Sequence, residues 1–360
     1  MNTRKPAGIG RRLRACWVVL SSAIGLVAPP GLHAGDPAVE QLAREVGAKG
    51  WIVFAAKTPQ GDYDLFLSRP DGAHLRNLTQ TAQWSEYGGR FSPDAKRLLY
   101  RRQPKGPQIH PEEGINHDLW GAMGSLVIAD ADGSNPAVQG EEGEFPWASW
   151  SPDGRQIACL YKREGKIRIF DLATRKPVRE LPRQGIFQQL FWSPDGKRLC
   201  GTANLDGQDW NIVSLELSTG KTTLLSRVVN CTPDWFQGDP DRVIYSNRTP
   251  GLGNEYGWTM LMQATTNGKS RTLIYGERGR HIYYGCTSPD DQYAIFSVPE
   301  SDGGTDAAMA IVRLADSPII VPGDYQELKA LYPNAKSGPV LRLPLTGFEP
   351  HWTYAAISRR

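Results

Sequence analysis

A short motif recurs along this chain and constrains its fold more than any other feature. Each copy reads Ser-Pro-Asp, with Gly next in two copies, and a run of β-forming residues follows. Ser, Pro, Asp and Gly in this order are typical of a type I turn between antiparallel strands. The better copies recur at about forty residues, the length of one propeller blade. They are Phe91 to Asp94, Trp150 to Gly154, Trp192 to Gly196 and Thr287 to Asp290, with a degraded copy at Asp239 to Asp241.

A second hairpin of alternating residues follows each turn, which gives four strands per unit. The last hairpin is ambiguous, because its outer strand could be Ile319 to Val321 or Val340 to Leu345, with Tyr325 to Leu331 as an inserted helix. The hairpins are Leu126 to Val138, Ile167 to Leu181, Ile212 to Leu225, Met260 to Ile274 and Met309 to Ile320.

The two ends of the chain supply complementary parts of one further unit. Trp51 to Phe54 and Tyr63 to Leu78 provide its second, third and fourth strands, but no first strand precedes them. Near the C-terminus, Gly347 to Tyr354 resembles the strand that leads into the motif elsewhere. We therefore predict an all-β fold over residues 50-360, a six-bladed β-propeller with four-stranded blades, closed by the C-terminal strand.

The repeat resembles that of the TolB-like propeller family, whose blades carry the Trp-Ser-Pro-Asp-Gly turn, over about residues 50 to 355. This repeat occurs in binding proteins, in propellers attached to peptidases and in some polysaccharide-degrading enzymes. TolB proteins also carry a separate N-terminal domain, whereas in this chain a segment of residues 35-49 precedes the propeller. Asp36 and Pro37 are typical of a helix start, so we expect a short helix or linker in that segment.

Residues 1-34 are typical of a secretory signal peptide. Arg4, Lys5 and the pair Arg11-Arg12 precede the apolar run Ala15 to Ala28, which is short for a membrane span. We expect cleavage near Gly35 and a periplasmic or secreted protein without stable membrane insertion, with an uncleaved anchor as the alternative. Sec export is favoured over Tat export, although the arginine pair leaves both open.

The basic charge of the full chain comes from this leader. Removing it takes five of 41 Lys and Arg and none of 38 Asp and Glu, which leaves 36 basic against 38 acidic residues. No basic stripe remains that could neutralise a run of phosphates. Nucleic acid is therefore a poor candidate partner.

Sequence motifs of common catalytic sites are absent. The chain has no G-x-S-x-G nucleophile elbow and no H-E-x-x-H zinc motif. The four cysteines beyond the leader have no C-x-x-C spacing, and their disulfide state stays open. We expect a binding protein rather than an enzyme, without a cofactor. These cysteines are Cys159, Cys200, Cys231 and Cys286.

Function is expected on the face opposite the Ser-Pro-Asp turns, which themselves are expected to be scaffold. Two long insertions, Arg102 to Gly124 and Asn247 to Trp258, emerge there, and the innermost strands enter the central channel from that side. Aromatic and polar residues there suit an envelope protein or a glycan ligand, although packing between blades is the alternative for each aromatic. We expect a monomer. The candidate ligand-binding residues are Tyr87, Trp120, Trp147, Gln188, His281, Tyr283 and His351.

The family resemblance also implies an alternative function. Some TolB-like propellers are manganese-dependent oligogalacturonate lyases, in which channel histidines and a glutamine hold the metal. His281, His351 and Gln188 are the counterparts that this resemblance suggests, and imidazole with amide oxygen can bind Mn²⁺. A structural scaffold without a specific ligand is the second alternative.

Overall fold

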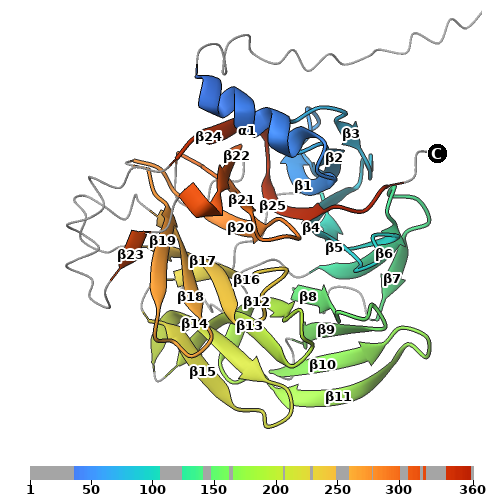
Figure 1. Ribbon diagram of the computed structural model, residues 1–360. Coiled ribbons are helices and arrows are strands. Elements are labelled where there is room, and N and C mark those ends of the chain that lie inside the picture. The colour runs from blue at the N-terminus through green and yellow to red at the C-terminus, as the bar shows by residue number, and fades with distance from the viewer. Residues whose placement is uncertain are drawn as a thin grey trace, which may run out of the picture.

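The computed structural model confirms the propeller, with six antiparallel sheets arranged in a ring around a central axis (Figure 1). We name these sheets blades A to F in chain order. The structure describes residues 36–105, 124–140, 147–161, 165–205, 207–227, 230–248, 259–277, 279–300, 307–316, 319–321 and 338–357.

The first three blades each have four strands, which follow one another from the channel outward. Blade A consists of β25 (Phe348–Thr353), β1 (Trp51–Lys57), β2 (Tyr63–Ser68) and β3 (Arg76–Asn77). Blade B consists of β4 (Trp84–Phe91), β5 (Arg97–Pro104), β6 (Ser125–Asp130) and β7 (Ala137–Gln139). Blade C consists of β8 (Trp147–Trp150), β9 (Gln156–Tyr161), β10 (Lys166–Asp171) and β11 (Lys176–Pro182).

The other three blades complete the ring. Blade D consists of β12 (Ile186–Trp192), β13 (Arg198–Leu205), β14 (Gln208–Glu216) and β15 (Thr222–Ser226). Blade E consists of β16 (Asn230–Trp235), β17 (Arg242–Arg248), β18 (Thr259–Thr265), β19 (Arg271–Tyr275) and β23 (Ile319–Val321). Blade F consists of β20 (Tyr283–Thr287), β21 (Tyr293–Ser297), β22 (Ala308–Arg313) and β24 (Val340–Thr346).

The ring closes as the sequence predicted, because the C-terminal strand β25 pairs with β1 inside blade A. Ile52 faces Trp352 in this pairing, and Val53 faces His351. The Trp352 side chain is completely buried, and its indole N–H donates to the carbonyl oxygen of Lys49 at 2.7 Å. Both chain ends are thus held in one blade by strand pairing and by a buried aromatic ring.

The last hairpin differs from the prediction over Met309 to Ile320. The outer strand of blade F is β24, which supports the second of the two alternatives. Ile319–Val321 instead forms β23, which pairs with β19 and gives blade E a fifth strand. A short run such as this pairs with whichever open edge it reaches, and its sequence does not specify that edge. Tyr325 to Leu331 lies outside the described residues.

The Ser-Pro-Asp turns have the expected hydrogen bonds. The carbonyl oxygen of Ser151 accepts from the amide of Gly154 at 2.9 Å, and its hydroxyl lies 2.6 Å from an Asp153 carboxylate oxygen. The fourth turn position is left-handed in each copy, with φ of 67° at Gly154 but also 51° at Ala95 and 53° at Asp291. Glycine therefore relieves strain at this position but is not required there.

A short helix, α1 (Pro37–Gly47), precedes the ring and lies along blades F and A (Figure 1). Asp36 begins it, since its carboxylate accepts from the amide of Ala38 at 2.9 Å. Leu42 and Val46 are completely buried in the core between the two blades, and Glu45 pairs with Arg313 at 2.8 Å. No helix within the described residues has the length and apolar character needed to cross a membrane.

Candidate functional site

The innermost strands of five blades carry a β-bulge at the same distance before the turn motif. At each bulge one residue has a left-handed backbone, with φ between 44° and 63°. Four of these residues are not glycine, and such strained positions cluster at functional sites. They are Gly88, Gln189, Thr232, Tyr284 and Glu349, on β4, β12, β16, β20 and β25.

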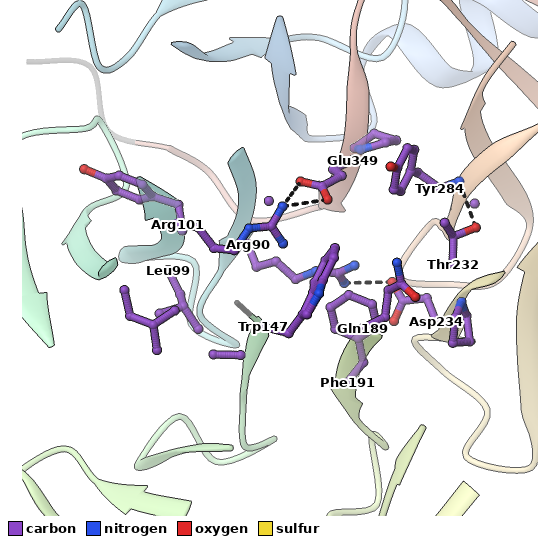
Figure 2. A pocket seen from close by; sticks show the side chains of 17 residues that line it. Arg90, Leu99, Arg101, Trp147, Gln189, Phe191, Thr232, Asp234, Tyr284 and Glu349 are labelled. Atoms are coloured by element: carbon purple, nitrogen blue, oxygen red, sulfur yellow. Dashed lines mark hydrogen bonds and ion pairs between the residues drawn. The ribbon is translucent and has the colours of Figure 1, made fainter. Parts of the chain in front are cut away.

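These bulge residues meet at the centre of the molecule. Together with Trp147, which occupies the same position on β8 of blade C, they line one pocket in the channel (Figure 2). Each blade therefore contributes one side chain or glycine to a ring around the channel axis. A bulge re-aims the residue that it contains, which explains why this position faces the axis.

A buried ion pair occupies part of this pocket. The guanidinium of Arg101 donates to both carboxylate oxygens of Glu349, at 2.9 and 3.0 Å, and stacks over the Trp147 ring at 3.9 Å. A Cβ atom at Gly88 would approach Glu349 to 3.1 Å and Arg101 to 3.3 Å. Glycine at position 88 thus leaves the space that the ion pair fills.

A second ion pair crosses the channel beside the first. Arg90 donates to a carboxylate oxygen of Asp234 at 2.7 Å, and its guanidinium lies over the Phe191 ring at 3.7 Å (Figure 2). Burial lowers the pKa of Arg90, but the attraction of Asp234 outweighs this, so the pKa is raised and Arg90 stays charged. Two paired arginines therefore obstruct the middle of the channel.

The space that remains in this pocket is small, about 30 Å³. At roughly 10 to 15 Å³ for each water molecule, it holds about two waters. Two buried nitrogens, Trp147 Nε1 and Arg101 Nε, have no hydrogen-bond partner within the described part of the chain. Water in this space would satisfy them, as buried donors require.

A much wider recess, of about 500 Å³, opens below this constriction on the face of the Ser-Pro-Asp turns. The turn prolines of four blades line it together with aromatic residues of the inner strands, while Arg90 and Asp234 lie where it meets the constriction. We call it the turn-face recess. The prolines are Pro93, Pro152, Pro194 and Pro289, and the aromatic residues include Trp150, Trp192, Trp235 and Tyr354.

His351 lies in this recess and is held as a neutral acceptor. Its Nδ1 accepts from the amide of Phe91 at 3.2 Å, and the two rings lie 5.9 Å apart. Burial lowers the pKa of His351 well below its ordinary value, and the positive charge of Arg90 lowers it further. The imidazole therefore serves as a neutral link between blades A and B.

The seven candidate residues that the sequence suggested lie at different places in the structure. Trp147 lines the central pocket and His351 lines the turn-face recess. Tyr87 is buried against the rings of Tyr63 and Phe348, at 5.3 and 5.8 Å, in the space between blades A and B. Gln188 is also buried, and it is the adjacent Gln189 that lines the pocket.

His281 and Tyr283 form a buried polar cluster at the channel end where β20 begins. Their rings stack at 6.0 Å, and each side chain is at most 4% exposed. Thr259 lies 3.2 Å from His281 Nδ1 and donates to the Tyr283 hydroxyl at 3.3 Å, to which Arg248 also donates at 3.2 Å. These contacts are internal, so the two rings shape this end of the channel.

The remaining candidate, Trp120, lies outside the described residues, as do most residues of both long insertions. No three His, Cys, Asp or Glu side chains are grouped to hold a metal ion anywhere in the described ranges. His281 and His351 each have separate local partners, Thr259 and Phe91. The described structure gives no support to the metal site of the lyase alternative.

Sequence reasoning missed most of the residues in the central pocket, although a signal for them exists. The bulge residues stand four positions before the Ser of the turn, or its equivalent, whereas Tyr87, Gln188 and Tyr283 stand five positions before it. Adjacent residues of a strand point to opposite sides of the sheet, so a shift of one position decides whether a side chain faces the channel or packs between blades. The residues that surround the channel axis can therefore be identified by their distance from the turn motif.

The comparisons with known sequences agree with this architecture. No protein-family profile matches the chain. Tol-Pal system protein TolB from Francisella tularensis subsp. mediasiatica is 33% identical over 105 residues, which are 28% of this chain and 24% of TolB. The TolB of Alcanivorax borkumensis is 37% identical over 86 residues, 23% of this chain and 20% of TolB. The chain thus matches about a quarter of the length of these relatives.

Solved structures show the same fold over a larger share of the chain. TolB from Acinetobacter baumannii covers 87% of this chain and 69% of its own, with a TM-score of 0.59 at 16% identity. A chain of the nidogen/laminin complex covers 81% of this chain and 97% of its own, with a TM-score of 0.52 at 10% identity. The repeat and the closed ring show that this chain is a six-bladed β-propeller, and the TolB matches support a TolB-like propeller.

Proposed function

We propose that this protein is an exported, non-catalytic binding module of the cell envelope. In place of the opposite face that the sequence suggested, we propose the face of the Ser-Pro-Asp turns as the place where an envelope protein docks. The observation that carries the proposal is the turn-face recess, about 500 Å³ in volume and closed at its inner end by paired arginines. A recess that ends inside the protein accepts a projecting side chain or loop. The TolB relatives are named for the Tol-Pal system, which favours a partner of that kind.

The lining of the recess favours a protein partner over a glycan. Trp150 and Trp235 are only 7% and 3% exposed, so their ring faces are committed to packing. The accessible surface is made instead by proline rings, by the partly buried Trp192 and Tyr354, and by the polar base around His351. Rigid apolar walls around a polar base suit an aromatic or aliphatic anchor residue with a hydrogen-bonding neighbour.

A binding titration with the Pal protein of the same organism tests the proposal. Two variants probe the turn-face recess, one is a control, and one probes the opposite face. Pro152→Ala and Trp192→Ala should each weaken binding by about tenfold or more, as truncation of a binding hot spot does. Pro177→Ala, on the exposed outer strand of blade C, is the matched control and should bind as wild type. Trp120→Ala probes the face opposite the turns, where the sequence predicts the long insertions.

The outcomes separate the two faces. Binding that is lost only in Trp120→Ala would place the partner on the face opposite the turns, and Pal binding that is unchanged in all variants would place its site outside the turn-face recess. No binding of Pal to wild type would show that Pal is not the partner. Stoichiometric Mn²⁺ in the purified protein, together with cleavage of oligogalacturonate, would overturn the non-catalytic proposal.

Export is tested separately from docking. N-terminal sequencing of the protein from the periplasmic fraction should begin close to Gly35, because the apolar run of the leader ends shortly before it. Recovery of a chain that begins at Met1 in the membrane fraction would contradict export with cleavage. The docking experiment uses the mature chain and is unaffected by this result.

A further inference from the structure

A pocket of about 240 Å³ lies between the outer parts of blades B and C, which are neighbours in the ring (Figure 1). Blade B contributes residues of β6 and β7 to its walls, and blade C contributes residues of β9, β10 and the turn that follows β10. The pocket shares no lining residue with the turn-face recess. It is therefore a separate candidate site, which we call the interblade pocket.

Apolar side chains form the inner wall of the interblade pocket. Leu126, Ile157 and Cys159 are at most 2% exposed and belong to the core between the two blades, and the partly buried Phe170 and Leu172 pack against that core. Burial raises the pKa of Cys159, so its thiol is a neutral, apolar part of this wall. An apolar cavity of about 150 Å³ takes up benzene in another protein. The larger interblade pocket therefore admits a branched aliphatic or phenyl group together with a polar end.

Two residues of opposite charge line the same pocket. Asp171 and Arg175 bound the turn between β10 and β11, in which the Arg175 amide donates to the carbonyl oxygen of Asp171 at 2.8 Å. Within the described residues no ion pair joins their side chains. The ion pairs of this hairpin instead join Lys166 and Arg168 to Glu180, at 3.2 and 2.6 Å. The pocket is thus lined by one carboxylate and one guanidinium that do not neutralise each other.

Both charged groups have atoms available to a ligand. One carboxylate oxygen of Asp171 accepts from the amide and the hydroxyl of Thr174, at 2.8 and 2.9 Å, and these bonds lower the pKa of Asp171. Its other oxygen accepts no hydrogen bond in the described part of the chain. Arg175 is exposed, and its guanidinium makes no hydrogen bond or ion pair with the described residues. An acceptor and a forked donor therefore lie beside an apolar space.

We propose that the interblade pocket binds a free apolar α-amino acid such as leucine. The side chain of the amino acid enters the apolar space, its ammonium group binds Asp171 and its carboxylate binds Arg175. A ligand with both charges beside an apolar group matches all three features of the pocket. A hydrophobic carboxylate without an amino group would meet the negative charge of Asp171, and a hydrophobic amine would meet the positive charge of Arg175.

Calorimetric titration of the mature protein with leucine and two matched analogues tests this proposal. The analogue 4-methylpentanoate is leucine without its ammonium group, and 3-methylbutylamine is leucine without its carboxylate. Leucine should bind at a single site, and each analogue should bind about five- to tenfold more weakly, because it loses one charged contact near the surface. Failure of leucine to bind, or equal binding of leucine and either analogue, would overturn the proposal.

Two variants assign the two charges. Asp171→Asn keeps the oxygen that accepts from Thr174 but removes the charge, so it should weaken leucine by about five- to tenfold without weakening 4-methylpentanoate. Arg175→Gln should weaken leucine by a similar factor and leave 3-methylbutylamine unchanged. Lys221→Gln, at the exposed turn between β14 and β15 of blade D, is the matched control and should bind leucine as wild type. Equal losses for leucine and for the analogue that lacks the contact would contradict the assignment.

Filling the pocket tests its location. Val138 lines the pocket from β7 and is half-buried, so Val138→Trp should place an indole in the apolar space and abolish leucine binding. Thermal unfolding of this variant checks that it is folded, and leucine should raise the unfolding temperature of wild type but not of the variant. Undiminished leucine binding by a folded Val138→Trp protein would overturn the proposed site.

A measurement on wild type keeps the proposal testable if Val138→Trp folds poorly. The methyl resonances of Val138 and Leu172, which both line the pocket, should shift as leucine is added, whereas those of Leu224 on β15 of blade D should not. Unshifted Val138 and Leu172 methyl groups at saturating leucine would overturn the proposal. None of these experiments involves Pal, so their outcome is independent of docking on the turn face.

Discussion

Arg90 of blade B reaches across the channel to Asp234 of blade E, and the two charged groups are 2.7 Å apart. These blades are not neighbours in the ring, so the contact joins opposite sides of the propeller. The side chains are only 18% and 10% exposed, which means that removing either partner leaves a charge with little water to solvate it.

Arg90→Ala should therefore lower the free energy of unfolding by about 3 to 5 kcal/mol, as breaking a buried ion pair does in other proteins. Urea unfolding measures this change. Asp234→Ala should have a similar effect, whereas the double variant Arg90→Met with Asp234→Leu should recover much of the loss because no charge is stranded. Additive losses in the double variant would show that the pair does not act as a unit.

The closing strand should be the second sensitive place. Trp352→Ala removes a completely buried ring and should cost about 3 to 5 kcal/mol. Trp352→Phe keeps most of the ring but loses the hydrogen bond to Lys49, at a cost of about 1 kcal/mol plus some packing. Thermal unfolding compares the two.

Truncation after Thr346 goes further, since it exposes the edge of β1 that β25 covers. The truncated chain should aggregate, as open strand edges do. A truncated protein as soluble and heat-stable as the full chain would contradict closure by β25.

The buried imidazole of His351 predicts that acid destabilises the folded protein. Its pKa is lowered in the folded protein, so the unfolded chain binds a proton that the folded chain does not. Stability should fall by about 1.4 kcal/mol per pH unit below about pH 6.5, where unfolded histidine titrates.

The His351 effect is measured in a Glu86→Gln background. Burial raises the pKa of Glu86 to about 7, so this group contributes a slope of the opposite sign over part of the same pH range. Adding His351→Gln should flatten the acid slope, and His74→Gln at an exposed histidine should not. Equal slopes with and without His351 would show that this imidazole is protonated in the folded state.

The cysteines should be inert thiols. Cys159, Cys200, Cys231 and Cys286 are buried, and no disulfide joins them in the described part of the chain. Burial raises the pKa of Cys286 to about 12, so almost no thiolate is available at neutral pH. A thiol reagent should leave the native protein unmodified and label four thiols per mature chain after unfolding without a reductant. Fewer thiols under those conditions would reveal a disulfide.

The fold was predictable because the Ser-Pro-Asp turn carries local chemistry that repeats. Ser151, Pro152 and Asp153 specify the turn by themselves, and the same letters recur in four blades. Closure was predictable too, because an unpaired strand at each end of the chain has one natural partner.

The pairing of β23 and the identity of the central ring were not predictable in the same way. Ile319–Val321 has the composition of any short strand, and its partner depends on which edge lies within reach. The bulges shift the channel-facing position from Gln188 to Gln189, and Gln189 has no glycine to mark a left-handed backbone. The ion pairs join residues far apart in sequence, such as Arg101 and Glu349, so no local sequence pattern predicts them.

The pairing of the two ends of the chain in blade A also constrains the order of folding. Ile52 pairs with Trp352, three hundred residues later, so the first blade to be synthesised is the last to be completed. Contacts of such long sequence separation slow folding, because the intervening chain must be organised before they form. The edge of β1 that β25 covers therefore stays unpaired until the C-terminal strand is available, and the incomplete chain presents an open strand edge of the kind that promotes aggregation.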